Sequence, residues 1–155
     1  MLYFVLKYLH VLGATVLLGT GAGIAFFMLL AHRTGDAATV AAVARMVVVA
    51  DFVFTASAVV VQPVTGLALA LLVGYPLWQG WLLVSIILYL VTGAFWLPVV
   101  WMQVRMRDLA TDAAAGARPL PPQYHRLFRL WFVCGIPAFG AVLAIFWLMI
   151  TRGIS

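Results

Sequence analysis

YLHVLGATVLLGTGAGIAFFMLLA occupies residues 8–31 and contains no Asp, Glu, Lys or Arg. A helix needs roughly 20 apolar residues to cross a bilayer, and this run is longer than that. It also exceeds the apolar region of a secretory signal peptide, roughly 7–15 residues, and no Ala-x-Ala cleavage pattern follows it. The stretch therefore predicts a retained transmembrane helix over residues 2–31.

The composition extends this interpretation to the whole chain. Of its 155 residues, 66% are hydrophobic and 8% are charged, whereas a soluble domain usually carries about 25% charged residues. Three further stretches, 46–73, 80–104 and 127–151, are long and apolar enough to span a bilayer. The sequence predicts an all-α polytopic membrane protein, a single domain over residues 1–155 in which four transmembrane helices form an up-and-down bundle in the lipid bilayer.

The positive charge is concentrated between the predicted spans. A net charge of +5 would suggest nucleic acid in a soluble protein, but the positive-inside rule accounts for it here, and no nucleic-acid partner is expected. The 74–79 connection carries no charge, and the stretch 108–123 is expected to be a loop. These features place both termini outside (periplasmic) in a bacterial inner membrane. The arginines expected on the cytoplasmic side are Arg33, Arg45, Arg105, Arg107, Arg118 and Arg126.

Each predicted span carries a stripe of small or polar residues. At about 100° per residue, His10 shares a face with Gly13 and Ala14, so small side chains clear space beside its imidazole. Such a histidine is either a ligand or proton-handling residue, or a hydrogen-bonding contact between helices. Counting inward from the outer ends places polar residues of the next two spans at the same depth. The candidate binding site is His10, Gly13, Ala14, Gln62, Thr65, Ser85 and Tyr89.

A second polar layer is expected nearer the cytoplasmic ends. There Asp51 on the second span and Arg129 on the fourth are predicted to form a buried ion pair, with proton relay as the alternative role for Asp51. On the first span, Gly19 and Gly23 form a GxxxG pair that points roughly away from His10. That pair suits close packing against a partner helix, either in a homodimer or in another membrane protein.

The chemistry open to a single intramembrane histidine is narrow. His10 is able to serve as the axial imidazole of a haem iron. His32 lies 22 residues further on, about 33 Å along a helix, and like His125 it is interpreted as an interfacial residue, so bis-histidine ligation within one chain is excluded. A copper site lacks Cys or Met near His10, and zinc catalysis lacks three protein ligands. Redox chemistry on a bound cofactor is the only enzymatic function left open, and no catalytic residue is assigned.

Four segments resemble the DUF 2269 family of predicted bacterial integral membrane proteins, and the resemblance covers nearly the whole chain. It implies a fold and a location but no established activity. The segments are KYLHVLGATVLLGTGAG (7–23), ADFVFTASAVVVQPVTG (50–66), GAFWLPVVWMQVRMRDLA (93–110) and RLWFVCGIPAF (129–139).

The chain also resembles, more distantly, the HemJ-type protoporphyrinogen oxidases and the CopD-like membrane proteins. HemJ-type proteins bind haem b and need their first-span histidine, so this resemblance implies that His10 is a metal ligand. They carry a span-three lysine and an Asn-Glu pair before the span-four proline, where this chain has Ser85 and the pair Cys134-Gly135, so protoporphyrinogen oxidation is not expected. The resemblance rests on Lys7, His10, Gly19, Pro63, Gly66, Arg129 and Pro137.

Two functions follow as hypotheses. In the first, the protein binds haem b through His10 and takes part in membrane electron transfer or oxidation. In the second, it is a non-enzymatic assembly or transport subunit whose polar stripes hold the bundle together.

Overall fold

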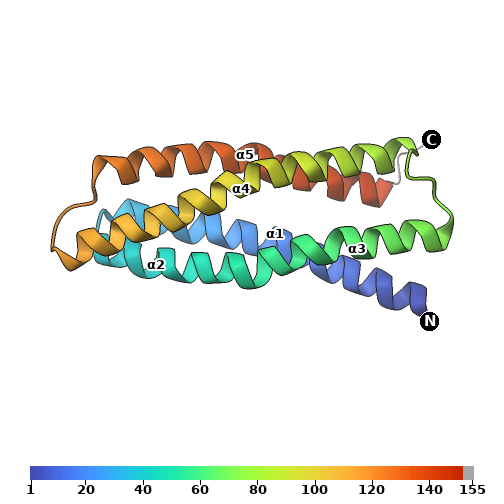
Figure 1. Ribbon diagram of the computed structural model, residues 1–155, viewed down its shortest axis with the longest axis horizontal. Helices are drawn as coiled ribbons and strands as arrows, with labels where there is room; N and C mark the ends of the chain where they lie inside the picture. The colour runs from blue at the N-terminus through green and yellow to red at the C-terminus, as the bar shows by residue number, and fades with distance from the viewer. Residues whose placement is uncertain (152–155) are drawn as a thin grey trace.

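Four helices long and apolar enough to cross a membrane make up the computed structural model, which describes residues 1–151 (Figure 1). They run up and down, and no strand occurs in this part of the chain, so the predicted all-α bundle is confirmed. In chain order the elements are α1 (Leu2–Thr34), the continuous helix formed by α2 (Ala37–Ala50), η1 (Asp51–Thr55) and α3 (Ala56–Val73), then α4 (Gly80–Ala115) and α5 (Pro122–Thr151).

The first two connections begin where the local sequence favours a helix end. Gly35 after α1 and Gly74 after α3 are left-handed, with φ of 67° and 77°, a conformation that glycine adopts without steric cost. Asp36 caps α2, because its carboxylate accepts from the Thr39 hydroxyl at 2.6 Å and from the Thr39 backbone N–H at 2.8 Å. These two hydrogen bonds hold the pKa of the Asp36 carboxyl below its usual range.

The helices extend well beyond the predicted spans. With 33 and 36 residues, α1 and α4 are about 50 and 54 Å long at 1.5 Å per residue, whereas the hydrocarbon layer is about 30 Å thick. The expected loop over 108–123 is wrong in its first half, because α4 continues to Ala115. The run Ala113, Ala114 and Ala115 consists of the strongest helix former, and Ala113 is buried in the core.

The hydrophobic core occupies one end of the bundle. This end, which we call the arginine end, carries the 35–36 and 116–121 connections, and α2 packs against α4 there. The opposite end, which we call the terminal end, holds the N-terminus, the 74–79 connection and the end of α5 (Figure 1). The core consists of Ile24, Met28, Ala31, Ala37, Val40, Ala41, Ala44, Val47, Met102, Met106, Ala110, Ala113, Leu120, Tyr124, Leu127, Phe128 and Trp131.

Toward the terminal end the helices associate as two pairs. α1 packs against α3 and α4 against α5, while α1 and α5 make few contacts with each other. The right-hand end of Figure 1 shows this arrangement, with α4 and α5 above and α1 and α3 below. The pairs leave room between them, and the candidate site lies there.

One turn of the second transmembrane helix departs from α geometry. η1 is a single π-helical turn in which Asp51 and Thr55 are both buried. Turns of this kind appear inside α-helices mostly as single units and are frequent at functional sites. The internal prolines Pro63, Pro98 and Pro137 lie within α3, α4 and α5 without ending them, so this irregularity falls at Asp51 rather than at a proline.

Candidate functional site

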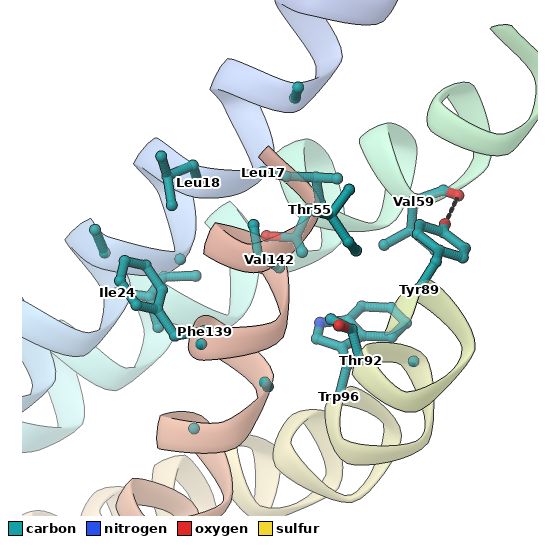
Figure 2. Close-up of a pocket in the computed structure, with 18 of the residues that line it drawn as sticks. Leu17, Leu18, Ile24, Thr55, Val59, Tyr89, Thr92, Trp96, Phe139 and Val142 are labelled. Atoms are coloured by element: carbon teal, nitrogen blue, oxygen red, sulfur yellow. Dashed lines mark hydrogen bonds between the residues drawn. The ribbon is translucent and has the colours of Figure 1, made fainter. Parts of the chain in front are cut away.

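A cavity of about 930 Å³ lies between the two helix pairs, and its walls are almost entirely apolar. This volume is near the upper limit of ordinary ligand pockets, which span roughly 300–1,000 Å³. Residues from α1, η1, α3, α4 and α5 contribute to the lining. Figure 2 shows lining side chains from α1 (Leu17, Leu18, Ile24), from α4 (Tyr89, Thr92, Trp96) and from α5 (Phe139, Val142).

The cavity runs from His10 near the terminal end to the hydrophobic core. Ile24 and Trp131 belong to both the cavity wall and the core. His10 and Ile24 are fourteen residues apart on α1, which corresponds to about 21 Å of helix. The cavity therefore joins the two depths at which the sequence places polar residues.

The cavity opens sideways, between α1 and α5. Val11 on α1 and Ile136 and Ile150 on α5 line the cavity and yet are more than half exposed. In a membrane this exposed apolar surface faces acyl chains rather than water. Acyl chains would therefore meet this part of the cavity wall directly.

His10 is fixed by a hydrogen bond that also determines its tautomer. Its Nδ1 lies 2.9 Å from Oγ1 of Thr65 on α3. The single hydroxyl proton of Thr65 is donated to the carbonyl of Val61 at 2.7 Å, so toward His10 this oxygen acts as the acceptor. His10 therefore carries its proton on Nδ1, and Nε2 keeps its lone pair.

The free nitrogen of His10 remains available. Nε2 has no hydrogen-bond partner among the described residues and is not one of the fully buried unpartnered atoms, and His10 itself is one of the residues that line the cavity. A metal-binding imidazole is typically held in this way, with one nitrogen bonded to a protein oxygen and the other free for the metal.

Two glycines allow α1 and α3 to approach closely at His10. The Gln62 side-chain amide donates to the His10 carbonyl at 2.7 Å, and a Cβ on Gly13 would lie 2.7 Å from that amide nitrogen. A Cβ on Gly66 would lie 3.1 Å from Cε1 of the His10 ring. A side chain at Gly13 would therefore have to displace the Gln62 amide, and one at Gly66 would have to shift the His10 ring.

Most of the predicted site residues come together, although not all of them face the cavity. His10, Ala14, Gln62 and Tyr89 line it. Gly13 lies under Gln62, and Thr65 holds His10, as described above. Ser85 is buried, but its hydroxyl donates to the Trp81 carbonyl within α4 and it is not part of the cavity wall. The Tyr89 hydroxyl donates to the Val59 carbonyl and so joins α4 to α3 (Figure 2).

The predicted ion pair between Asp51 and Arg129 is not formed. Asp51 is 3% exposed, and its carboxylate accepts from Nε1 of Trp96 at 3.4 Å and lies beside the Thr55 side chain. Arg129 is exposed on α5, and Arg107 and Asp108 form the sole salt bridge within residues 1–151. The reason is the rotation of α5, which turns Phe128 and Trp131 into the core and leaves Arg129 on the outer surface.

The same rotation explains which residues of α5 the sequence pattern missed. The predicted ion pair requires Arg129 on the buried face of this span. The face that lines the cavity instead carries Trp131, Gly135, Phe139, Val142 and Phe146, spaced three to four residues apart as on one side of a helix. The sequence contains this apolar periodicity, but the charge of Arg129 suggested that a different face of the helix is buried.

The remaining histidines lie at the arginine end. His32 stacks on Phe128 with ring centroids 3.7 Å apart, and its ring is 5.6 Å from that of His125. Both are far from His10, as predicted. An added Cβ on Gly19 or Gly23 would meet nothing within 4 Å among residues 1–151, so the space beside both is open. Their role toward a partner helix stays a prediction.

The fold and the cavity define a class of protein: a four-span integral membrane protein with a lateral, largely apolar cavity. Residues 4–153 match the family model described as predicted integral membrane protein (DUF2269), and the chain belongs to this family. No curated protein and no solved structure matches the chain. The similarity to HemJ-type and CopD-like proteins therefore stays a prediction.

Proposed function

We propose that the protein binds haem b in the cavity, with His10 Nε2 as an axial ligand of the iron, and that it serves electron transfer or oxidation in the bacterial inner membrane. The observation that carries the proposal is the tautomer of His10. Thr65 fixes the proton on Nδ1 and leaves a free lone pair on Nε2 of this cavity-lining residue.

The donor set agrees with a haem better than with a bare metal ion. Within residues 1–151 no group of three His, Cys, Asp or Glu side chains gathers as a metal site. A haem iron needs only one or two axial ligands from the protein, because the porphyrin supplies the other four. A single well-oriented imidazole is therefore sufficient for haem, whereas zinc requires at least three protein ligands.

The surroundings of His10 also suit an apolar macrocycle with charged substituents. Gly13 and Gly66 keep the backbone close and leave the imidazole as the projecting group at this position. Lys7 lies one turn before His10 and is exposed, so it would be the nearest cation in the sequence for a haem propionate. When bound, the haem would supply a one-electron redox couple. The chain's own contribution is to orient the imidazole, through Thr65, and to exclude water from the cavity.

The competing proposal gives His10 a purely structural role in an assembly or transport subunit. Its support is that Gln62 and Thr65 already use the His10 carbonyl and Nδ1 to join α1 and α3. The two proposals differ in what they require of Nε2, which only the haem proposal uses.

An absorption spectrum tests the proposal. The protein is expressed with a haem precursor, purified in mild detergent, and measured oxidised and then dithionite-reduced. We expect a Soret band and α/β bands that sharpen on reduction, and we expect His10→Ala to lose them. His125→Ala is the matched control, because that histidine is outside the cavity and should keep the bands. A colourless wild-type protein, or an unchanged spectrum for His10→Ala, would contradict haem ligation by His10.

A further inference from the structure

A second, more open hollow lies on the outside of the second transmembrane helix. It is a groove of about 420 Å³, and its wall comes from α2 and η1 alone. We call it the Arg45 groove. None of its residues lines the cavity that contains His10, so the two sites are separate. The groove is lined by Arg45, Met46, Val49, Ala50 and Phe54.

The π turn explains why these residues share one side of the helix. Arg45 and Phe54 are nine residues apart, which at 3.6 residues per turn would place them on opposite sides of an α-helix. A π turn takes up one residue more, and here the Ala56 N–H bonds the Asp51 carbonyl. The extra residue reduces the angle between Arg45 and Phe54 to about a quarter of a turn. The same turn that buries Asp51 and Thr55 therefore brings Phe54 into line with the groove.

The groove has a charged end and an apolar end. Met46, Val49 and Phe54 are 71%, 61% and 52% exposed, so in a membrane their side chains face lipid. Arg45 is exposed at the end of the groove nearer the arginine end of the bundle. Its guanidinium forms no salt bridge among residues 1–151. An uncompensated cation that continues into an apolar surface is complementary to an amphiphile with an anionic head.

The groove also lies at the depth where a bilayer changes from acyl chains to head groups. Counted from Val73, where α3 ends at the terminal end, Phe54 and Arg45 lie about 28 and 42 Å along the helix. The hydrocarbon layer is about 30 Å thick, and head groups extend the bilayer to about 40–45 Å. Trp78, exposed in the connection after α3, is typical of the opposite interface. Phe54 therefore falls beside acyl chains, and Arg45 falls near the level of the head groups.

From the charge, the lining and the depth of the Arg45 groove we propose that it binds an anionic phospholipid. The Arg45 guanidinium holds the phosphate, and one acyl chain lies along Met46, Val49 and Phe54. A guanidinium suits this head group because its planar donors form paired hydrogen bonds with phosphate oxygens. A zwitterionic lipid fits less well, since its own ammonium group cancels the net charge that attracts it to Arg45. The proposal is independent of haem binding, because the groove shares no residue with the His10 cavity.

Native mass spectrometry of the detergent-purified protein tests the proposal, with phosphatidylglycerol and phosphatidylcholine of identical acyl chains as probes. We expect the first phosphatidylglycerol to bind more tightly than the first phosphatidylcholine. Arg45→Gln should weaken phosphatidylglycerol binding about fivefold, the effect of one basic residue at a lipid surface, and should remove the preference. Arg45→Lys keeps the charge and should retain most of the affinity. Phe54→Ala should weaken both lipids alike, since it removes contact with the acyl chain and no charge.

Arg118→Gln is the matched control, because Arg118 is also exposed at the arginine end but lies in the 116–121 connection, outside the groove. It should bind both lipids like the wild type. Equal affinity of the wild type for the two lipids would overturn the proposal. Equal losses for Arg45→Gln and Arg118→Gln would do so too, because they would indicate diffuse attraction to the whole basic end. A dimer that Phe54→Ala dissociates, with lipid binding unchanged, would assign the groove to a second copy of the chain instead.

Discussion

Thr65 on α3 accepts a hydrogen bond from His10 on α1 at 2.9 Å, and it can do so because its own proton goes to the Val61 carbonyl. The relationship is directional. It sets which nitrogen of His10 carries the proton, it joins two transmembrane helices, and it leaves Nε2 outside this bond. The Thr65 hydroxyl thus helps to hold α1 against α3 and also determines which nitrogen of His10 can act as a ligand.

Thr65→Val tests whether Thr65 fixes the tautomer of His10, because valine keeps the shape of threonine and removes only the hydrogen bond. If His10 ligates haem, the loss of this supporting bond is expected to lower haem retention by about 10–100-fold, measured as haem per protein after purification. Thr15→Val is the matched control, because the Thr15 hydroxyl also bonds the carbonyl four residues earlier, at Val11, but at an exposed position. Equal haem content in the two variants would contradict the role of Thr65.

Gly13→Ala tests the close approach of α1 to α3. The added methyl would lie 2.7 Å from the Gln62 amide nitrogen, so that the amide must move and its bond to the His10 carbonyl is lost. We expect a destabilisation of about 1–3 kcal/mol, as for other overpacked sites, measured by thermal unfolding in detergent. Gly19→Ala on the same helix meets no neighbour and should be neutral or stabilising by up to about 1 kcal/mol. Equal effects of the two changes would argue against the tight contact.

Asp51 and Arg129 should behave as independent sites. Because they form no ion pair, a double-mutant cycle of Asp51→Asn and Arg129→Gln is expected to be additive within about 0.5 kcal/mol. Asp51→Asn alone should not destabilise the bundle, since it removes a buried charge that has no counter-ion. Thermal unfolding of the two single variants and the double variant measures both effects. A coupling energy well above this limit would show that the ion pair does form.

Tyr124→Phe should leave the arginine end as stable or make it more stable. Tyr124 is fully buried, and its hydroxyl has no hydrogen-bond partner. An unpaired buried hydroxyl costs about 1–3 kcal/mol, which the phenylalanine would recover while keeping the ring packed beside His32 and Phe128. Tyr8→Phe, at an exposed position, is the control and should change little. A clear loss of stability for Tyr124→Phe would reveal a partner for this hydroxyl.

The sequence predicted the fold because the signal for a membrane helix is length and apolarity, and both are local properties. Several polar positions were also predictable, since the positions of His10, Gln62, Thr65 and Tyr89 follow from helical periodicity. The relation of Asp51 to Arg129 was predicted wrongly. The charge of Arg129 suggested that its face of α5 is buried, whereas the apolar face with Phe128 and Trp131 packs in the core. The π turn and the tautomer of His10 depend on single hydrogen bonds in three dimensions, and no sequence pattern reports those.

The excess length of the helices has a consequence for how the molecule holds together. About 20 Å of the roughly 50 Å helices must project beyond the hydrocarbon layer, and the charges and the buried core at the arginine end identify that end as the projecting part. There water drives apolar side chains together, as in any soluble bundle, whereas within the bilayer lipid offers no such force. The packed core in water therefore holds the four helices together. The part within the bilayer does not need a filled core and can contain the cavity.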